Sequence, residues 1–178
     1  MALITRISSN FTATDTSSAE PSITPTTDVA VNYVMTTADG TGADQADLIY
    51  TNKVTLSAAS STSIDLAGSL TDYYGATITF AKIKLIMVKN TSNALGTPTT
   101  STISVGGAGA TAFKNWITST ADDGSENVKV LVGGFLAIGS PAAAGYGVTA
   151  ATADILKILN DSGASQAQYE IVIVGTSA

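Results

Sequence analysis

The chain has 178 residues, of which 44% are hydrophobic and 12% are charged, so a single domain with a sizeable core is expected. Its net charge of −6 argues against nucleic-acid binding, which needs clustered Lys and Arg side chains. The absence of Cys and His removes thiol chemistry, the commonest metal ligand and the commonest general base, so no enzyme is expected.

Hydroxyl side chains replace the missing charges. The sequence holds 27 Thr and 19 Ser residues, and these types favour strands and turns respectively. A surface with few ions loses little hydration when it is covered. This composition suits a protein that stays in contact with neighbouring molecules.

Residues 1–47 are predicted to form an extended N-terminal arm followed by an acidic loop. The segment 12–27 is rich in Ser and Thr and contains two prolines, which favour an extended tether. Four apolar residues and one arginine at the start of the arm are the candidate partner-binding residues: Leu3, Ile4, Arg6, Ile7 and Phe11.

We expect this arm to add as a strand to the sheet of a neighbouring subunit, with Arg6 against a carboxylate of the partner. The alternative is that Leu3, Ile4 and Ile7 form the first strand of the chain's own sandwich. The start of the chain lacks the basic and apolar regions of a secretory signal, and no apolar run is long enough to predict a membrane span.

The next segments alternate between apolar and polar residues, which is typical of strands. Residues 28–36 and 48–56 are predicted strands on either side of the acidic loop 38–47, and 57–63 is a predicted polar turn. Within 76–90 the apolar residues change from even to odd positions, which predicts a β-bulge near Ala81. Lys82 and Lys84 are expected to face solvent.

The C-terminal half continues with short segments between turns. Strands are predicted at 102–105, 128–132, 135–138, 146–150 and 169–174. Residues 155–159 fit either a helical face or a strand, and we favour a β-hairpin with the terminal strand. These elements predict an all-β fold, a β-sandwich of jelly-roll type over residues 48–178.

Few residues offer chemistry. A Ser–Lys pair or paired carboxylates are the remaining catalytic options, and Asp122 with Asp123 is predicted to be a solvated turn rather than a calcium site. The glycines of 106–109 lack the spacing of a phosphate loop. Phe113 and Trp116 are expected in the core rather than on a sugar-binding surface. No catalytic, metal or cofactor-binding residue is therefore predicted.

Four segments resemble a family of small tailed-phage virion proteins, described as uncharacterised or head-decoration proteins. They lie at 65–80, 132–136, 145–150 and 169–175, and they match strand and turn sequences of that family in the same order. Residues 1–47 depart from the family's pattern.

The resemblance implies a capsid cement or decoration protein, made in the host cytoplasm and located on the capsid surface of the virion. Its partners would be the major capsid protein and other copies of itself, with a trimer as the first expectation, and neither nucleic acid nor a membrane. The alternative is a phage tail or receptor-binding module that contacts carbohydrate through Phe113, Trp116, Tyr73 and Tyr74.

Overall fold

The computed structural model describes residues 3–16, 26–68, 70–95, 101–117 and 124–178. Two 3-10 helices, η1 (Ser92–Leu95) and η2 (Gly109–Thr111), accompany the strands of the described part. The strands are β1 (Thr5–Thr16), β2 (Thr26–Thr37), β3 (Leu48–Leu56), β4 (Ser61–Asp65), β5 (Leu70–Thr71), β6 (Thr77–Ile78), β7 (Lys82–Asn90), β8 (Ile103–Gly106), β9 (Asn127–Val130), β10 (Phe135–Gly139), β11 (Tyr146–Gly147), β12 (Ile155–Asn160) and β13 (Ala167–Thr176).

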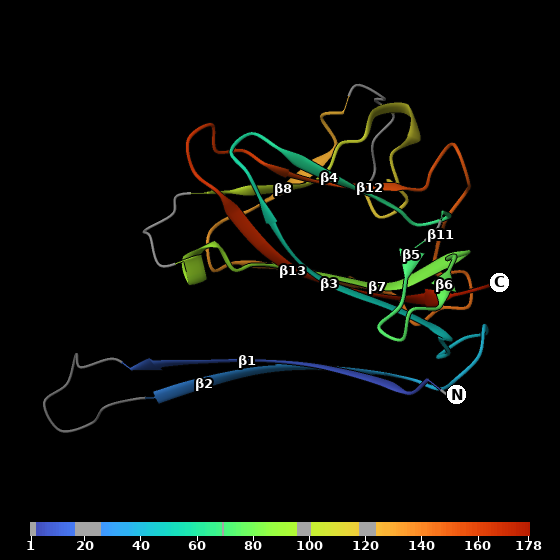
Figure 1. Cartoon of the computed structure of the whole chain (residues 1–178). Coiled ribbons are helices and arrows are strands. Elements are labelled where there is room, and N and C mark those ends of the chain that lie inside the picture. The colour runs from blue at the N-terminus through green and yellow to red at the C-terminus, as the bar shows by residue number, and fades with distance from the viewer. Residues whose placement is uncertain (1–2, 17–25, 69, 96–100, 118–123) are drawn as a thin grey trace, which may run out of the picture.

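Two antiparallel sheets pack face to face, and a long hairpin of β1 and β2 lies outside them (Figure 1). The larger sheet has the order β10-β7-β13-β3, with β11 also paired to β7, and the smaller sheet has the order β4-β12-β8-β9. The predicted all-β sandwich is therefore confirmed.

The connections identify the sandwich as a jelly roll. From β3 onward the main strands alternate between the two sheets, except that β8 and β9 are neighbours in the smaller sheet. The result is eight main strands arranged as four in each sheet, which is the architecture of the jelly roll. Residues 155–159 form the strand β12, but the predicted hairpin with β13 is wrong, because β12 pairs with β4 and β8 in the opposite sheet.

The core follows from the alternation of apolar residues along the strands. Alternate residues of β13 point inward, and Tyr169, Ile171 and Ile173 are buried against the smaller sheet's Leu156 and Ile158. Phe113 is also buried, and Trp116 packs partly against the same core while its Nε1 donates to the carbonyl of Phe113 at 2.9 Å. Phe113 therefore belongs to the core, as predicted, whereas Trp116 is half-buried at its border.

A bulge interrupts β7 three residues after the predicted position. Val174 pairs with Leu85 and Gly175 pairs with Ile83, so Lys84 has no counterpart in β13. The extra residue turns the backbone so that Ile83 and Ile86 both reach the core. Lys84 is fully buried, and the prediction that it faces solvent is wrong.

The N-terminal segment also differs from the prediction of a single extended arm with a tether. β1 and β2 form a continuous antiparallel ladder from Thr5↔Thr37 to Thr16↔Thr26. Part of the predicted tether, residues 12–16, is thus a regular strand. The prolines that suggested the tether, Pro21 and Pro25, lie outside the described residues.

Tyr169 makes the stability of the core sensitive to alkaline pH. Burial raises the pKa of Tyr169 to about 12 from its ordinary value of 10.0, so the folded chain keeps a proton that the unfolded chain releases between these values. The free energy of unfolding should fall by about 1.4 kcal/mol per pH unit in that interval because of this residue. Urea unfolding of Tyr169→Phe should show a shallower alkaline loss than the parent chain; equal losses would contradict the prediction.

Candidate interaction surface

The root of the hairpin is packed on the outer face of the larger sheet. Met35 is buried with Leu85 and Val174, and Ile7 and Leu3 pack partly against this cluster. The hydroxyls of Thr5 and Thr37 are 2.6 Å apart, and the Leu3 amide donates to Asp39 Oδ1 at 3.0 Å. These contacts fix the direction in which the hairpin leaves the sandwich.

A buried lysine fastens the loop that joins the hairpin to the sandwich. Lys84 Nζ donates to the carbonyl of Gly42 at 3.3 Å and to the carbonyl of Ala142. Asp44 N donates to the carbonyl of Pro141 at 2.9 Å, which ties the same two loops together. Burial, with a smaller contribution from the charge of Lys82, lowers the pKa of Lys84. The role of this lysine is to hold the hairpin root.

Beyond its root, the hairpin exposes an apolar face. Ile7 pairs with Met35 at the root, and Phe11 pairs with Val31 further out along the same ladder. Directly paired residues of an antiparallel ladder point to the same side, and alternate residues of a strand share a face, so Phe11, Val31 and Tyr33 continue the face that Met35 buries. Their exposed fractions are 60%, 61% and 49%. We call these three residues the distal apolar face.

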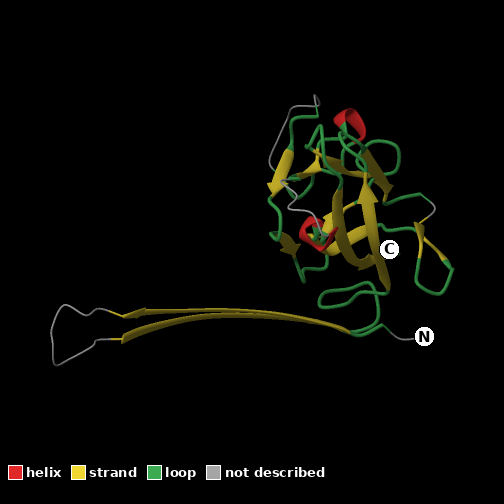
Figure 2. Ribbon diagram, turned by 60° about the vertical axis from the view of Figure 1, so that its left-hand side comes forward, coloured by secondary structure: helices red, strands yellow, loops and turns green. Residues whose placement is uncertain are grey.

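The hairpin runs below the larger sheet in Figure 1, and its far end extends well beyond the sandwich in Figure 2; its strands pair only with each other among the described sheets. Each of its strands has 12 residues, which corresponds to a length of about 40 Å. The opposite face carries mainly polar side chains, including Arg6, Ser8, Asn10 and Asn32, and all four are exposed. The distal apolar face is therefore an uncovered surface on a projecting, two-stranded arm.

The candidate partner-binding residues do not lie together. Leu3 and Ile7 are half-buried in the root, where they contact the chain's own sandwich. Ile4 and Arg6 are exposed, and Arg6 lies on the polar face, while Phe11 lies on the distal apolar face. Val31 and Tyr33 are not among the predicted binding residues, although their alternation marks them as part of a strand.

The tyrosines named for the alternative function are exposed, in contrast to Phe113. Tyr73 and Tyr74 are 88% and 75% exposed in the turn between β5 and β6. Their rings meet edge to face with centroids 5.6 Å apart. They form a small aromatic surface without the contribution expected from Phe113 and Trp116.

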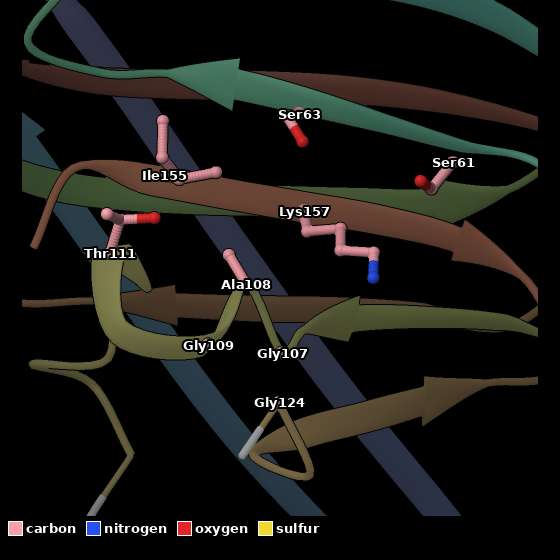
Figure 3. A pocket seen from close by; sticks show the side chains of 9 residues that line it. All are labelled: Ser61, Ser63, Gly107, Ala108, Gly109, Thr111, Gly124, Ile155 and Lys157. Carbon is pink, nitrogen blue, oxygen red and sulfur yellow. The ribbon is translucent and has the colours of Figure 1, made fainter. Parts of the chain in front are cut away.

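A hollow of about 560 Å³ on the smaller sheet is lined by Ser61, Ser63 and Lys157, the residue types of a catalytic Ser–Lys pair (Figure 3). Lys157 pairs across the strands with Ser63, and Ser61 lies on the same floor. Among the described contacts, neither hydroxyl is hydrogen-bonded to Lys157, so the arrangement does not provide an activated nucleophile.

The glycines beside this hollow have a packing role. Gly106 and Gly107 have φ values of 110° and 77°. A Cβ at Gly106 would lie 2.4 Å from the carbonyl oxygen of Glu126, and one at Gly107 would lie 2.4 Å from that of Gly124. The close approach of two backbones therefore accounts for these glycines without a ligand.

No family model, curated protein or solved structure matches this chain. Within the described residues, no group of three or more Asp and Glu side chains is placed to hold a metal ion. The helices of the described part include none that is long and apolar enough to cross a membrane. The predicted turn at Asp122 and Asp123 lies outside the described residues.

Proposed function

We propose that this chain is a non-enzymatic virion structural protein, a capsid cement or decoration protein that bridges neighbouring capsid subunits. The observation that carries the proposal is the distal apolar face on the projecting hairpin. Three large apolar side chains lie on an arm that is anchored firmly at its root and extends beyond the sandwich. Removing these apolar side chains from water lowers the free energy, and a partner that covers them provides this stabilisation.

The bridging role is supported by the division of the chain into a packed sandwich and a long hairpin. The jelly roll supplies a fixed platform, and the hairpin reaches a second subunit about 40 Å away. Among the described sheets, its two strands pair only with each other, and a partner strand adds to an outer edge by main-chain hydrogen bonds. Arg6, exposed on the polar face, then meets a carboxylate of the partner.

Two further considerations favour a capsid location. The segments at 65–80, 132–136, 145–150 and 169–175 resemble those of a tailed-phage virion family, and jelly rolls are frequent in viral capsid proteins. The second of these is an analogy at the level of the fold. The major capsid protein is the proposed partner, and neither a cofactor nor nucleic acid has a part in this role.

The second candidate function is a phage tail or receptor-binding module. The exposed pair Tyr73 and Tyr74 favours it, because aromatic faces stack on sugars and other apolar ring surfaces. Burial of Phe113 and partial burial of Trp116 reduce the aromatic surface that this function was expected to use.

Binding to separated phage components distinguishes the two functions. The purified full chain is mixed with capsids that lack it and, in parallel, with isolated tails, and each mixture is sedimented. The proposal predicts saturable binding to capsids and none to tails. Binding to tails alone would support the receptor-binding module, and binding to neither component would contradict the proposal.

A further inference from the structure

One edge of the larger sheet lacks the usual protection against pairing with another chain. Among the described strands, β3, β4 and β9 form three edges of the sandwich, and β10 forms the fourth together with the two-residue β11. The first three carry Lys53, Asp65 and Lys129 respectively, and charged side chains are a common means of blocking edge-to-edge pairing. β10 has the sequence Phe-Leu-Ala-Ile-Gly and contains no charged residue or proline.

The free edge of β10 presents a defined set of backbone groups. Asn90 N donates to the carbonyl of Gly134 at 2.9 Å, and Ser140 N donates to the carbonyl of Lys84 at 2.8 Å. The backbone N–H and C=O groups of the even-numbered residues of β10 are therefore hydrogen-bonded to β7. Because this pattern alternates along a strand, the N–H and C=O groups of Phe135, Ala137 and Gly139 point outward to the free edge. None of the turn and loop hydrogen bonds described for the chain ends on these three residues.

We propose that β10 is an interface for a second copy of this chain, in which two β10 strands pair antiparallel about a two-fold axis at Ala137. This register joins Ala137 to its own counterpart and places Phe135 opposite Gly139 of the other copy. Each of the three pairs exchanges two backbone hydrogen bonds. The two larger sheets then form one continuous sheet across the pair.

Size complementarity favours a second copy over an unrelated strand. Phe135 is 69% exposed. In this register its ring lies over Gly139 of the other copy, which has no side chain. A Cβ at Gly139 would be 3.3 Å from Leu85 Cδ1 and 3.8 Å from Met35 Cε. The ring of the second copy thus extends the apolar cluster at the hairpin root, which is already an interface within the chain.

A two-fold pair differs from the trimer expected from the sequence. An antiparallel strand meets an identical strand only through a two-fold axis, and such an interface is self-complementary and closed. It also removes the unprotected edge. The pairing uses neither the distal apolar face nor the capsid, so it can be tested independently of the proposed function.

A single cysteine tests the register, because the natural chain contains none. Two Ala137 residues that face each other across antiparallel strands have Cα atoms about 5.5 Å apart, which is within the range of a disulfide. Ala137→Cys should cross-link into a dimer under mild oxidation, as seen on a non-reducing gel. Thr51→Cys, on the exposed face of the opposite edge strand, is the matched control and should stay monomeric.

Charge complementation gives a second test that needs no cross-link. Ala137→Lys and Ala137→Glu should each weaken the dimer at least about tenfold in sedimentation equilibrium, and an equimolar mixture of the two should restore it. A monomeric parent chain at high concentration would overturn the proposal. So would a dimer in which Ala137→Cys cross-links no better than Thr51→Cys. If Ala137→Lys is monomeric but still binds capsids, the proposed function and this interface are both supported as separate features.

Discussion

Replacing Phe11, Val31 and Tyr33 together by Ser should reduce binding to capsids by about fortyfold or more. Full burial of a large apolar side chain contributes about 1.5–3 kcal/mol, and these three are each exposed by roughly half or more in the free protein. Half of the lower figure from each residue is about 2.2 kcal/mol in total, which corresponds to a loss of about fortyfold. Sedimentation of the variant with capsids over a range of concentrations measures the change.

The polar face of the same hairpin supplies the matched control. Val34 is 53% exposed and lies in the row opposite to the distal apolar face, since it pairs with Ser8. Val34→Ser should bind capsids within about threefold of the parent chain. Both variants should have nearly the same free energy of unfolding as the parent chain, because the replaced side chains are exposed and make few contacts in the free protein. Equal losses of binding for the two variants would show that the apolar face is not the contact surface.

Asn90→Ala should lower the free energy of unfolding by about 3 kcal/mol or more. Asn90 is fully buried, and its Nδ2 donates to the carbonyls of Ser101 and Val130 at 2.9 and 3.0 Å. Its Oδ1 accepts from the amide and hydroxyl of Ser92 at 3.1 and 2.6 Å. Alanine leaves several of these groups buried without a partner, at a cost of about 1–3 kcal/mol each.

Urea unfolding measures this loss, and Asn52→Ala provides the comparison. Asn52 is exposed and donates to the Tyr50 hydroxyl at 3.0 Å, so water replaces its contacts and the change should be below about 1 kcal/mol. A loss for Asn90→Ala as small as that for Asn52→Ala would mean that the loops on either side of β7 are not held by this side chain.

The sequence predicts strands correctly where one face of the strand is buried and the other is exposed to solvent. Leu48, Tyr50, Val54 and Leu56 share one parity, and all four pack in the core. The same alternation predicts the strand at 28–36, which lies within β2. Local pattern is enough in these cases, because a strand with one buried face has side chains in a period of two.

The pairing of strands was much less accessible from sequence. The partner of β1 is β2, which begins ten residues after β1 ends. The alternation of apolar residues does not indicate which strand pairs with which. β12 was misassigned to a hairpin for the same reason, since the connection to β13 crosses between sheets. Register and partner choice depend on the whole sandwich rather than on the segment itself.

Two residues show why the candidate site was only partly predicted. Lys84 looks like a surface residue, because lysine is rarely buried, yet the bulge in β7 turns it toward two backbone carbonyls. Ile7 belongs to an apolar cluster near the start of the chain that was expected to bind a partner, and the hairpin instead packs it against its own sheet. Only Phe11 of the candidate residues lies on the distal apolar face, which pairing with Val31 creates.

Electron microscopy of purified virions that contain this protein tests the capsid assignment most directly. A reconstruction in which the jelly roll lies on the outer capsid surface, with Phe11, Val31 and Tyr33 of the hairpin against a neighbouring subunit, is the predicted result. Density for the jelly roll at the tail, or on the capsid with the distal apolar face turned to solvent, would contradict the account.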